Sequence, residues 1–388
     1  MKALLRYQQF LLILVMGTAV LGYALNTWVN PWRVTPTAWS SAAFDDYRAI
    51  DNEWNRTAKA GLAASGDWDA ALFGSSRVDI AFDPEHSLFE GRNCANLGLN
   101  AASISENHRI FSYFMDHHDP ELLVFAIDPG DLTTPHSTFN LTDFSLSPLN
   151  PDADPIEREL RYREGISTLA ASFDTIQRRL QHKPAEHTPQ GFRRDAPFPD
   201  NQRQLIAGLY LATTVRMVKG RTRYGQLDPT KLDLLDDVIE RCRTEDCRLV
   251  ILLTPNHGLF QLSYEELGDP DPIFEADRRA LAERATHGVE VWDFLDAHPI
   301  NSEPLPPAEP SSAHLRYWID LFHATPEVGN LMLDRIAGEP GDFGVRLTTD
   351  TIDARLEDIR AGLAAYRETR PEDVAFLQKS LDRYRPKP

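Results

Sequence analysis

One serine and one aspartate–histidine pair are the residues of this chain whose types and spacing best fit a chemical role. Ser76 follows a glycine and a serine at the end of the short apolar run 70–73, and His323 lies three residues after Asp320. A serine hydroxyl becomes a nucleophile when a base accepts its proton, and a carboxylate can hold the imidazole of that base in the required orientation. If the fold brings these segments together, they form a Ser-His-Asp site for acyl transfer.

Each segment on its own also has an ordinary structural explanation. A serine that follows a strand and a glycine is commonly the N-cap of the next helix, and an Asp and a His just before a helix are commonly surface residues. Their joint order carries the hypothesis. Ser76 follows the first predicted strand, whereas Asp320 and His323 precede the last predicted core helix, 327–336.

Apolar runs that alternate with helical periodicity predict the elements that must position these residues. The expected strands cover residues 70–73, 121–127, 248–254 and 289–293, with a short strand and loop over 91–100. The expected helices cover residues 105–117, 156–181, 228–247, 273–286, 327–336 and, as two helices, 352–384. This alternation predicts an α/β fold of three layers, in which a parallel sheet has helices on both faces.

Several polar residues follow the predicted strands and are expected at the edge of the sheet where ligands bind, together with Ser76. His257 is interpreted either as a substrate contact or rival base, or as a loop histidine. Asp128 is interpreted as a substrate contact, as one of an acid or metal pair with Asp131, or as a turn-capping residue. Arg77 either binds an anionic group of the substrate or forms an ion pair.

The N-terminus predicts a membrane anchor. The run 10–29 contains no charged residue, and about 20 apolar residues are enough to span a bilayer as a helix. Lys2 and Arg6 precede this run, and positive flanks stay in the cytoplasm. We therefore expect one pass through the inner membrane, with the body in the periplasm or outside the cell. A cleaved signal peptide, whose apolar core is about 7–15 residues, is the alternative.

The expected organisation has four parts. Residues 1–32 form the anchor and residues 33–69 a polar connector. A catalytic domain covers residues 70–338, interrupted by an insertion or lid at about 133–202 that is rich in Pro, Asp, Ser and Thr. Residues 339–388 form a helical extension.

Composition excludes some classes of function. The 388-residue chain has a formal net charge of −18, which argues against binding nucleic acid. Three cysteines are present, and the sequence leaves open whether Cys242 and Cys247 form a disulfide or remain free thiols. No zinc-ligand spacing occurs, and we expect neither a metal nor a cofactor.

The chain resembles the SGNH (GDSL-like) hydrolase superfamily in three short blocks. The turn at residues 74–76 resembles the Gly-Asp-Ser block, with Ser75 in place of the aspartate; residues 96–100 resemble the glycine block; and Asp320 to His323 resemble the late Asp-x-x-His block. The resemblance implies a flavodoxin-like sheet, with Ser76 as nucleophile, His323 as base and Asp320 as its orienting carboxylate.

The same resemblance implies an oxyanion hole that includes the N–H of Gly98. The chain departs from the family at the asparagine block, because Asp128-Pro-Gly-Asp131 stands where Gly-x-Asn-Asp is expected. A carboxylate would repel an oxyanion, so Asn100 is the suggested substitute donor. Loss of one donor typically costs about 2.7–4 kcal/mol in the transition state.

Within that superfamily, the Gly-Ser-Ser turn, the single anchor and the altered asparagine block are similar to extracytoplasmic acyl-transfer proteins, such as those of alginate acetylation and teichoic acid D-alanylation. The resemblance implies O-acyl, specifically acetyl, transfer from an acyl donor to a polysaccharide acceptor, beside a membrane-bound O-acyltransferase as partner. The alternatives are a non-catalytic scaffold of a polysaccharide assembly complex and a carbohydrate or lipid esterase.

Overall fold

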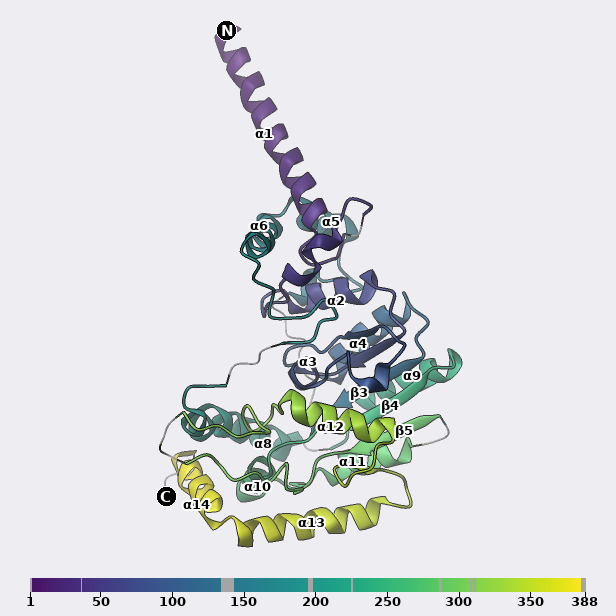
Figure 1. Cartoon of the computed structure of the whole chain (residues 1–388), viewed down its shortest axis with the longest axis vertical. Coiled ribbons are helices and arrows are strands. Elements are labelled where there is room, and N and C mark those ends of the chain that lie inside the picture. The colour runs from purple at the N-terminus through teal and green to yellow at the C-terminus, as the bar shows by residue number, and fades with distance from the viewer. Residues whose placement is uncertain are drawn as a thin grey trace. The chain divides into compact units, whose positions relative to one another are not determined.

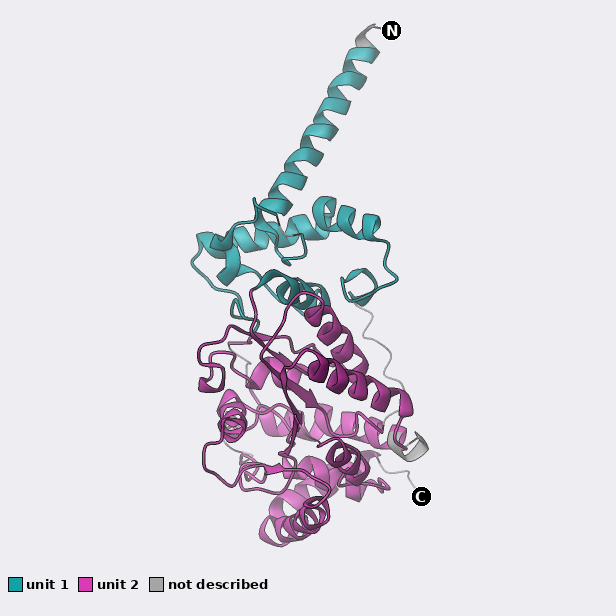
Figure 2. Ribbon diagram, turned by 90° about the vertical axis from the view of Figure 1, so that its right-hand side faces the viewer, with its two compact units in different colours: residues 1–66, 140–191 teal, residues 67–139, 192–388 magenta. Residues whose placement is uncertain are grey.

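The computed structural model describes residues 2–35, 37–133, 143–194, 198–224, 226–285, 288–307, 309 and 312–384 (Figure 1). The chain forms two compact units. Unit 1 comprises residues 1–66 and 140–191, and unit 2 comprises residues 67–139 and 192–388 (Figure 2). The segment that the sequence predicted as a lid over the catalytic domain therefore belongs mainly to unit 1, together with the predicted connector.

The core of unit 2 is a six-stranded sheet in the order β2-β1-β3-β4-β5-β6. The first five strands run parallel, and β6 is antiparallel to β5. The strands are β1 (Ala70–Phe73), β2 (Cys94–Asn96), β3 (Leu122–Ile127), β4 (Arg248–Leu253), β5 (Val289–Asp293) and β6 (Val345–Arg346). Every residue of β1 and β3 is buried, as expected of central strands in a parallel sheet. The predicted α/β class is confirmed at this level.

Helices connect these strands and extend the unit at its C-terminal end. The α-helices of unit 2 are α3 (Ser76–Ala81), α4 (Ile104–Met115), α7 (Gln202–Leu205), α8 (Leu211–Tyr224), α9 (Pro229–Thr244), α10 (Gly258–Glu266), α11 (Glu275–Glu283), α12 (Pro326–Ala337), α13 (Ile352–Thr369) and α14 (Pro371–Leu381). A π-helical turn, η4 (Ile206–Tyr210), joins α7 to α8. Phe73 of β1 packs edge-on against Phe111 and Phe114 of α4, with ring centroids 5.6 Å apart in both pairs.

Unit 1 contains the helices α1 (Lys2–Val29), α2 (Asn55–Ser65), α5 (Pro155–Glu164) and α6 (Ile166–Leu180). The sequence predicted one helix over 156–181, but the chain breaks at Gly165, whose backbone is extended. A Cβ atom on Gly165 would lie 2.2 Å from the carbonyl oxygen of Arg161, so only glycine fits this close junction. Within α1, Leu4–Val29 is long and apolar enough to cross a membrane, a property that signal sequences share.

The predicted connector is in fact part of the core of unit 1. Nine residues of α2 are buried, including four polar ones, Asn55, Arg56, Thr57 and Lys59. The backbone N–H of Thr57 donates to Asp143 (2.7 Å), and Lys59 Nζ donates to the Gly191 carbonyl (2.7 Å). Partners from residues 140–191 therefore make burial of this polar helix favourable.

Helix α12 packs closely against α3, and a glycine makes this approach possible. A Cβ atom on Gly329 would lie 1.7 Å from the Ala81 carbonyl oxygen. We expect Gly329→Ala to lower the free energy of unfolding by about 1–3 kcal/mol, measured by urea denaturation, because backbone must move to relieve the overlap. Gly220→Ala in α8, where a Cβ atom would meet nothing within 4 Å, should be neutral or stabilising. Equal stability of the two variants would contradict this packing argument.

Candidate active site

Ser76 occupies the tight turn between β1 and α3. A Cβ atom on Gly74 would lie 2.4 Å from Cγ2 of Val78, so glycine lets the strand turn directly into the helix. The Ser75 hydroxyl accepts the Arg77 N–H at 3.3 Å and caps α3. Ser76 is then the first residue of the helix and is only half-buried, so its hydroxyl can meet a substrate.

The structure brings the predicted triad residues together in one chain of hydrogen bonds. Ser76 Oγ lies 2.8 Å from His323 Nε2, and His323 Nδ1 lies 2.6 Å from Asp320 Oδ2. Because an ionised carboxylate only accepts hydrogen bonds, Nδ1 of a neutral imidazole carries the proton and Nε2 is free to accept the proton of Ser76. This is the geometry that a serine nucleophile and its base require.

A short antiparallel turn presents Asp320 and His323. The chain forms a bridge between Trp318 and Ala324, and the Ile319 N–H donates to the His323 carbonyl at 2.9 Å. Asp320 Oδ1 also accepts the backbone N–H of Phe322 (2.6 Å) and of His323 (2.8 Å). The carboxylate is therefore held from both sides, which keeps its second oxygen aimed at the imidazole.

Gln202, which the sequence did not single out, ties this turn to α7. It is fully buried, and its Nε2 donates to the carbonyl oxygens of Trp318 (2.6 Å) and Ile319 (2.9 Å). Its Oε1 accepts the Leu315 N–H at 2.7 Å. No local pattern in the sequence marks this glutamine, because its partners lie more than 110 positions away.

Tyr210 is a second group that the sequence did not reveal. Its hydroxyl hydrogen-bonds the Asp320 side chain, and burial together with that carboxylate raises the pKa of Tyr210. Burial acts to raise the pKa of Asp320, but its attraction to His323 and its hydrogen bonds to His323 and backbone N–H groups outweigh this, so the pKa of Asp320 is lowered. The aspartate is therefore ionised at neutral pH. Tyr210 lies in the π-helical turn η4, and such turns are frequent at functional sites.

We expect Tyr210→Phe to reduce the kcat of ester turnover about tenfold, equivalent to about 1.4 kcal/mol, with KM little changed. The ring would still pack against Phe322 (5.4 Å between centroids), but Asp320 would lose one donor and some of its fixed orientation. Tyr366→Phe is the matched control, because this hydroxyl also meets an aspartate, but that aspartate is Asp373, at 3.4 Å, and not Asp320. A tenfold loss in both variants would point to a general packing effect.

The structure gives a different role to the N–H of Gly98, which the family resemblance implies as an oxyanion donor. The Gly98 N–H donates to Asn96 Oδ1 at 3.0 Å, and a Cβ atom on Gly98 would lie 2.5 Å from the Asp79 nitrogen. Gly98 thus allows the loop after β2 to approach α3, while its N–H already has an acceptor. Asn100 is half-buried on the same loop. The Ser76 N–H, in the first turn of α3, has no acceptor among the residues that the structure describes, so it is free to donate to an oxyanion.

Arg77 forms an ion pair, which is one of the two roles that the sequence suggested for it. Its side chain is almost fully buried and donates to the Pro255 carbonyl (2.9 Å) and to the Asn256 side chain. Its Nε lies 3.4 Å from Asp128 Oδ2, and Thr254 Oγ1 donates to Asp128 Oδ1 at 3.1 Å. Arg77 and Asp128 thus join the ends of β3 and β4 beside the site. A substrate anion would have to displace these partners.

His257 does not lie where a substrate can reach it. It is fully buried, its Nε2 donates to the Glu303 carbonyl (2.7 Å), and its Nδ1 accepts the Leu259 N–H (3.1 Å), so it caps α10. The interpretation as substrate contact or rival base is therefore wrong for this structure. The position after a strand suggested an active-site role, but packing around the strand end buries the ring.

This buried histidine makes stability depend on pH. Burial lowers the pKa of His257 from 6.5 to about 4, whereas in the unfolded chain the ring protonates near its ordinary value. Stability is therefore lost as pH falls from about 6.5 to about 4, by about 3 kcal/mol from this residue. In His257→Asn, whose amide oxygen can still cap α10, the loss between pH 7 and pH 4.5 in urea unfolding should be smaller. An identical loss in both proteins would contradict this assignment.

The remaining polar candidates have structural roles. Asp131 accepts the Ile104 N–H (2.6 Å) at the start of α4 and pairs with Lys231 (2.9 Å). Within the described residues, no three His, Cys, Asp or Glu side chains gather as a metal site would require. Cys242 and Cys247 are free and buried, and the hydrogen bond between their side chains, with burial, raises the pKa of the Cys242 thiol.

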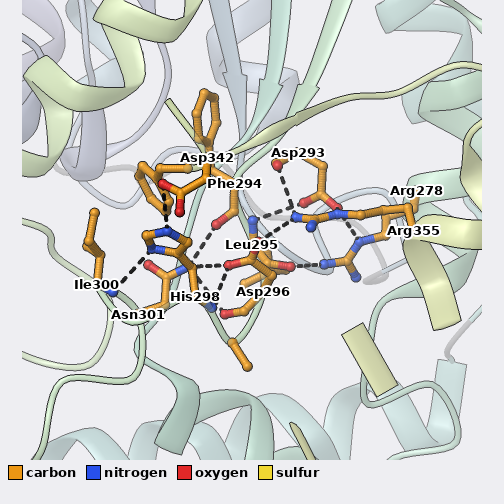
Figure 3. A network of polar contacts seen from close by, with 12 residues as sticks. Arg278, Asp293, Phe294, Leu295, Asp296, His298, Ile300, Asn301, Asp342 and Arg355 are labelled. Carbon is orange, nitrogen blue, oxygen red and sulfur yellow. Dashed lines mark hydrogen bonds and ion pairs between the residues drawn. The ribbon is translucent and has the colours of Figure 1, made fainter. Parts of the chain in front are cut away.

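A buried ion network supports the chain segment before the triad turn (Figure 3). Asp293, at the end of β5, binds Arg278 of α11 (2.8 Å) and Arg355 of α13 (2.9 Å) through the same oxygen. Arg355 also pairs with Asp296 at 2.9 Å. The following loop reaches the turn, because the Ile300 carbonyl accepts the indole N–H of Trp318 (2.9 Å). Helix α13 thereby helps to hold the edge of the sheet at which the candidate site lies.

No known protein-family model and no curated protein matches the chain. Support for a function therefore comes from the geometry of Ser76, His323 and Asp320 and from the elements that hold them.

Proposed function

We propose that this chain is an extracytoplasmic SGNH-like acyltransferase, which moves an acetyl group to a hydroxyl of an exported or cell-surface polysaccharide. The observation that carries the proposal is the continuous contact from Ser76 through His323 to Asp320. The strand order β2-β1-β3-β4-β5, which is that of flavodoxin-like sheets, supports the assignment to this fold. The triad lies beyond the carboxyl end of β1, where such sheets bind ligands.

The proposed reaction has two halves. Ser76 Oγ attacks the carbonyl carbon of the acyl donor while its proton passes to His323 Nε2, and Asp320 stabilises the imidazolium. The tetrahedral oxyanion faces the Ser76 N–H. When the intermediate collapses, the leaving group takes the proton from His323 and an acetyl-serine ester remains. A sugar hydroxyl then gives its proton to His323 and attacks the ester carbonyl; the bond to Ser76 Oγ breaks, and Ser76 Oγ takes the proton back from His323 as the acetylated sugar leaves.

The proposal also places the body outside the cytoplasm. Lys2 and Arg6 precede the apolar part of α1, and such positive flanks remain on the cytoplasmic side. A membrane-bound O-acyltransferase is the proposed partner, because it would deliver the acyl group across the bilayer. Protease treatment of intact spheroplasts should degrade the body, whereas protection of the body until lysis would reverse the orientation.

A non-catalytic scaffold is the second candidate, and two observations favour it. The Gly98 N–H is already bonded to Asn96, and the family's asparagine block is replaced by Asp128, which pairs with Arg77. Both features weaken the oxyanion hole and so favour an inactive relative. An esterase is chemically close to a transferase, because water uses the same base as a sugar hydroxyl.

One experiment separates these functions. The purified full-length chain is mixed with an activated acetyl ester, with and without an oligosaccharide acceptor, and acetate and acetylated sugar are both measured. Acetylated sugar supports the transferase, and acetate alone favours the esterase. No turnover of the ester by the folded protein would favour the scaffold. The whole chain is used because the last turns of α1, including Asn26 and Val29, are buried within unit 1.

A further inference from the structure

Helix α6 in unit 1 has its polarity reversed relative to an ordinary surface helix. Its buried residues are Thr168, Ser172 and Thr175. Three large apolar residues spaced seven apart form an exposed apolar stripe on another face: Ile166 (86% exposed), Phe173 (57%) and Leu180 (77%). A helix facing water buries its apolar face and exposes its polar one. The exposed apolar side chains of α6 are typical of a helix whose outer face contacts an apolar environment and not water.

Helix α5 extends the same property. Ile156 and Leu160, one turn apart, are 71% and 58% exposed. Outside α1, the described residues include eight exposed large apolar side chains, and six of them are in unit 1: Trp39, Ile156, Leu160, Ile166, Phe173 and Leu180. This concentration in the smaller unit marks a surface built for an apolar environment.

Contacts with α1 place these helices at the end of the apolar helix (Figure 1). Asn26 of α1 donates to the Arg163 carbonyl (2.9 Å) and accepts from the Ser172 hydroxyl (3.0 Å). Arg163 also donates to the Tyr23 hydroxyl at 2.8 Å. The junction between α5 and α6 is therefore fastened to the last turns of α1.

The length of α1 sets the depth of this junction. From Leu4 to Gly22 the helix rises about 28 Å, at about 1.5 Å per residue, which nearly equals the hydrocarbon thickness of about 30 Å. Tyr23 and Trp28 follow at the height where aromatic residues favour the membrane interface. If α1 spans the bilayer from Leu4, α5 and α6 meet it where hydrocarbon gives way to headgroups.

Charge is consistent with that position. Unit 1 contains 12 Lys and Arg and 12 Asp and Glu, so the formal net charge of −18 falls on unit 2; without Lys2 and Arg6, which lie across the bilayer, the part of unit 1 beside α5 and α6 has 10 basic and 12 acidic residues, a net charge of −2. Such a nearly neutral part meets less repulsion from anionic lipid than a strongly acidic surface would.

We propose that α5 and α6 lie in the interface of the bilayer that α1 enters, with the apolar stripe of α6 in contact with lipid. The two helices then form an interfacial platform, defined here as residues 155–180, beside the anchor. This inference depends on membrane entry of α1 but not on catalysis, so it stands or falls separately from the acyltransferase proposal.

Spin labels on single introduced cysteines test the platform in the full-length chain. The chain is reconstituted alone in vesicles of phosphatidylethanolamine and phosphatidylglycerol, and collisions of each label with oxygen and with a water-soluble nickel chelate are measured. Leu12→Cys in α1 is the bilayer reference, Glu372→Cys in α14 is the water reference, and Phe173→Cys is the test position. The three native cysteines are buried, and the unsubstituted chain gives their background.

The label at Phe173 should favour oxygen over nickel, as the label at Leu12 does, because oxygen concentrates in hydrocarbon. The matched control on the same helix is Asp174→Cys, an exposed position beside the stripe, whose label should be more accessible to nickel. If the Phe173 label meets nickel as freely as the Glu372 label while Leu12 stays in lipid, the proposal is overturned, and a protein partner becomes the occupant of the stripe. A Leu12 label that meets nickel freely would overturn the membrane entry on which the proposal depends.

Discussion

Ser76→Ala should reduce the kcat of ester turnover by about 10⁴- to 10⁶-fold, because it removes the oxygen that attacks the ester in the proposed mechanism. The substituted chain keeps His323 and Asp320 but lacks the hydroxyl that lies 2.8 Å from His323 Nε2. Release of the leaving group from an activated acetyl ester measures kcat. Mass spectrometry of the unsubstituted chain, quenched during turnover, should find an added acetyl group on the peptide that contains Ser76.

Ser75→Ala is the matched control for this loss. The Ser75 hydroxyl caps α3 by accepting the Arg77 N–H, so its removal should cost about 1 kcal/mol of stability while leaving most of the turnover. If Ser76→Ala turns over the ester as fast as the unsubstituted chain, the covalent mechanism is wrong. If the folded, unsubstituted chain shows no turnover of the ester, the result favours the non-catalytic scaffold instead.

Asp293→Asn should lower the free energy of unfolding by about 3–5 kcal/mol, the largest expected effect on stability. The fully buried carboxylate faces both Arg278 and Arg355, and an amide in its place would leave two buried positive charges without their shared partner. Urea denaturation measures the change. Because Arg355 lies in α13, the variant should also loosen the C-terminal helices from the sheet, which hydrogen exchange can detect.

Asp353→Asn is the control for Asp293→Asn, because Asp353 pairs with Arg279 at the surface and is 81% exposed. Such exposed pairs contribute about 0–1 kcal/mol. Burial opposes ionisation of Asp293, but Arg278 and Arg355 outweigh it and lower its pKa. The contribution of Asp293 is therefore present at neutral pH and is lost below its ordinary value of 3.8, as pH falls through the lower, folded-state pKa. Equal losses of unfolding free energy in the two variants would show that the buried ion network stabilises the fold no more than an exposed ion pair does.

Local patterns were sufficient to predict the strands that carry the site. The runs at 70–73 and 289–293 match β1 and β5, and the predictions for β3 and β4 differ by a residue at one end. Such runs can be read locally because strands buried on both faces of a parallel sheet are almost continuously apolar. The same patterns predicted Ser76 after a strand and His323 before a helix, since turn glycines and helix-starting prolines act locally.

Other features depended on partners distant in the sequence. Helix α2 carries polar residues that find partners such as Asp143 and Gly191 only in the folded chain, so its sequence resembles a connector. Gln202 and Tyr210 have no distinguishing local pattern, because their roles come from contacts with residues 318–320. His257 shows the opposite case, in which a position typical of an active site is closed by packing.

The sequence by itself determined the strand–helix alternation, the apolar N-terminal helix and the residue types of a possible triad, because each is encoded in neighbouring residues. Only the tertiary structure decided that Ser76 and His323, 247 positions apart, meet within hydrogen-bonding distance. It also decided that Gly98 already shares its N–H with Asn96, and that α6 exposes apolar rather than polar side chains. Distance, burial and hydrogen-bond partners are properties of the packed chain, and a local pattern contains none of them.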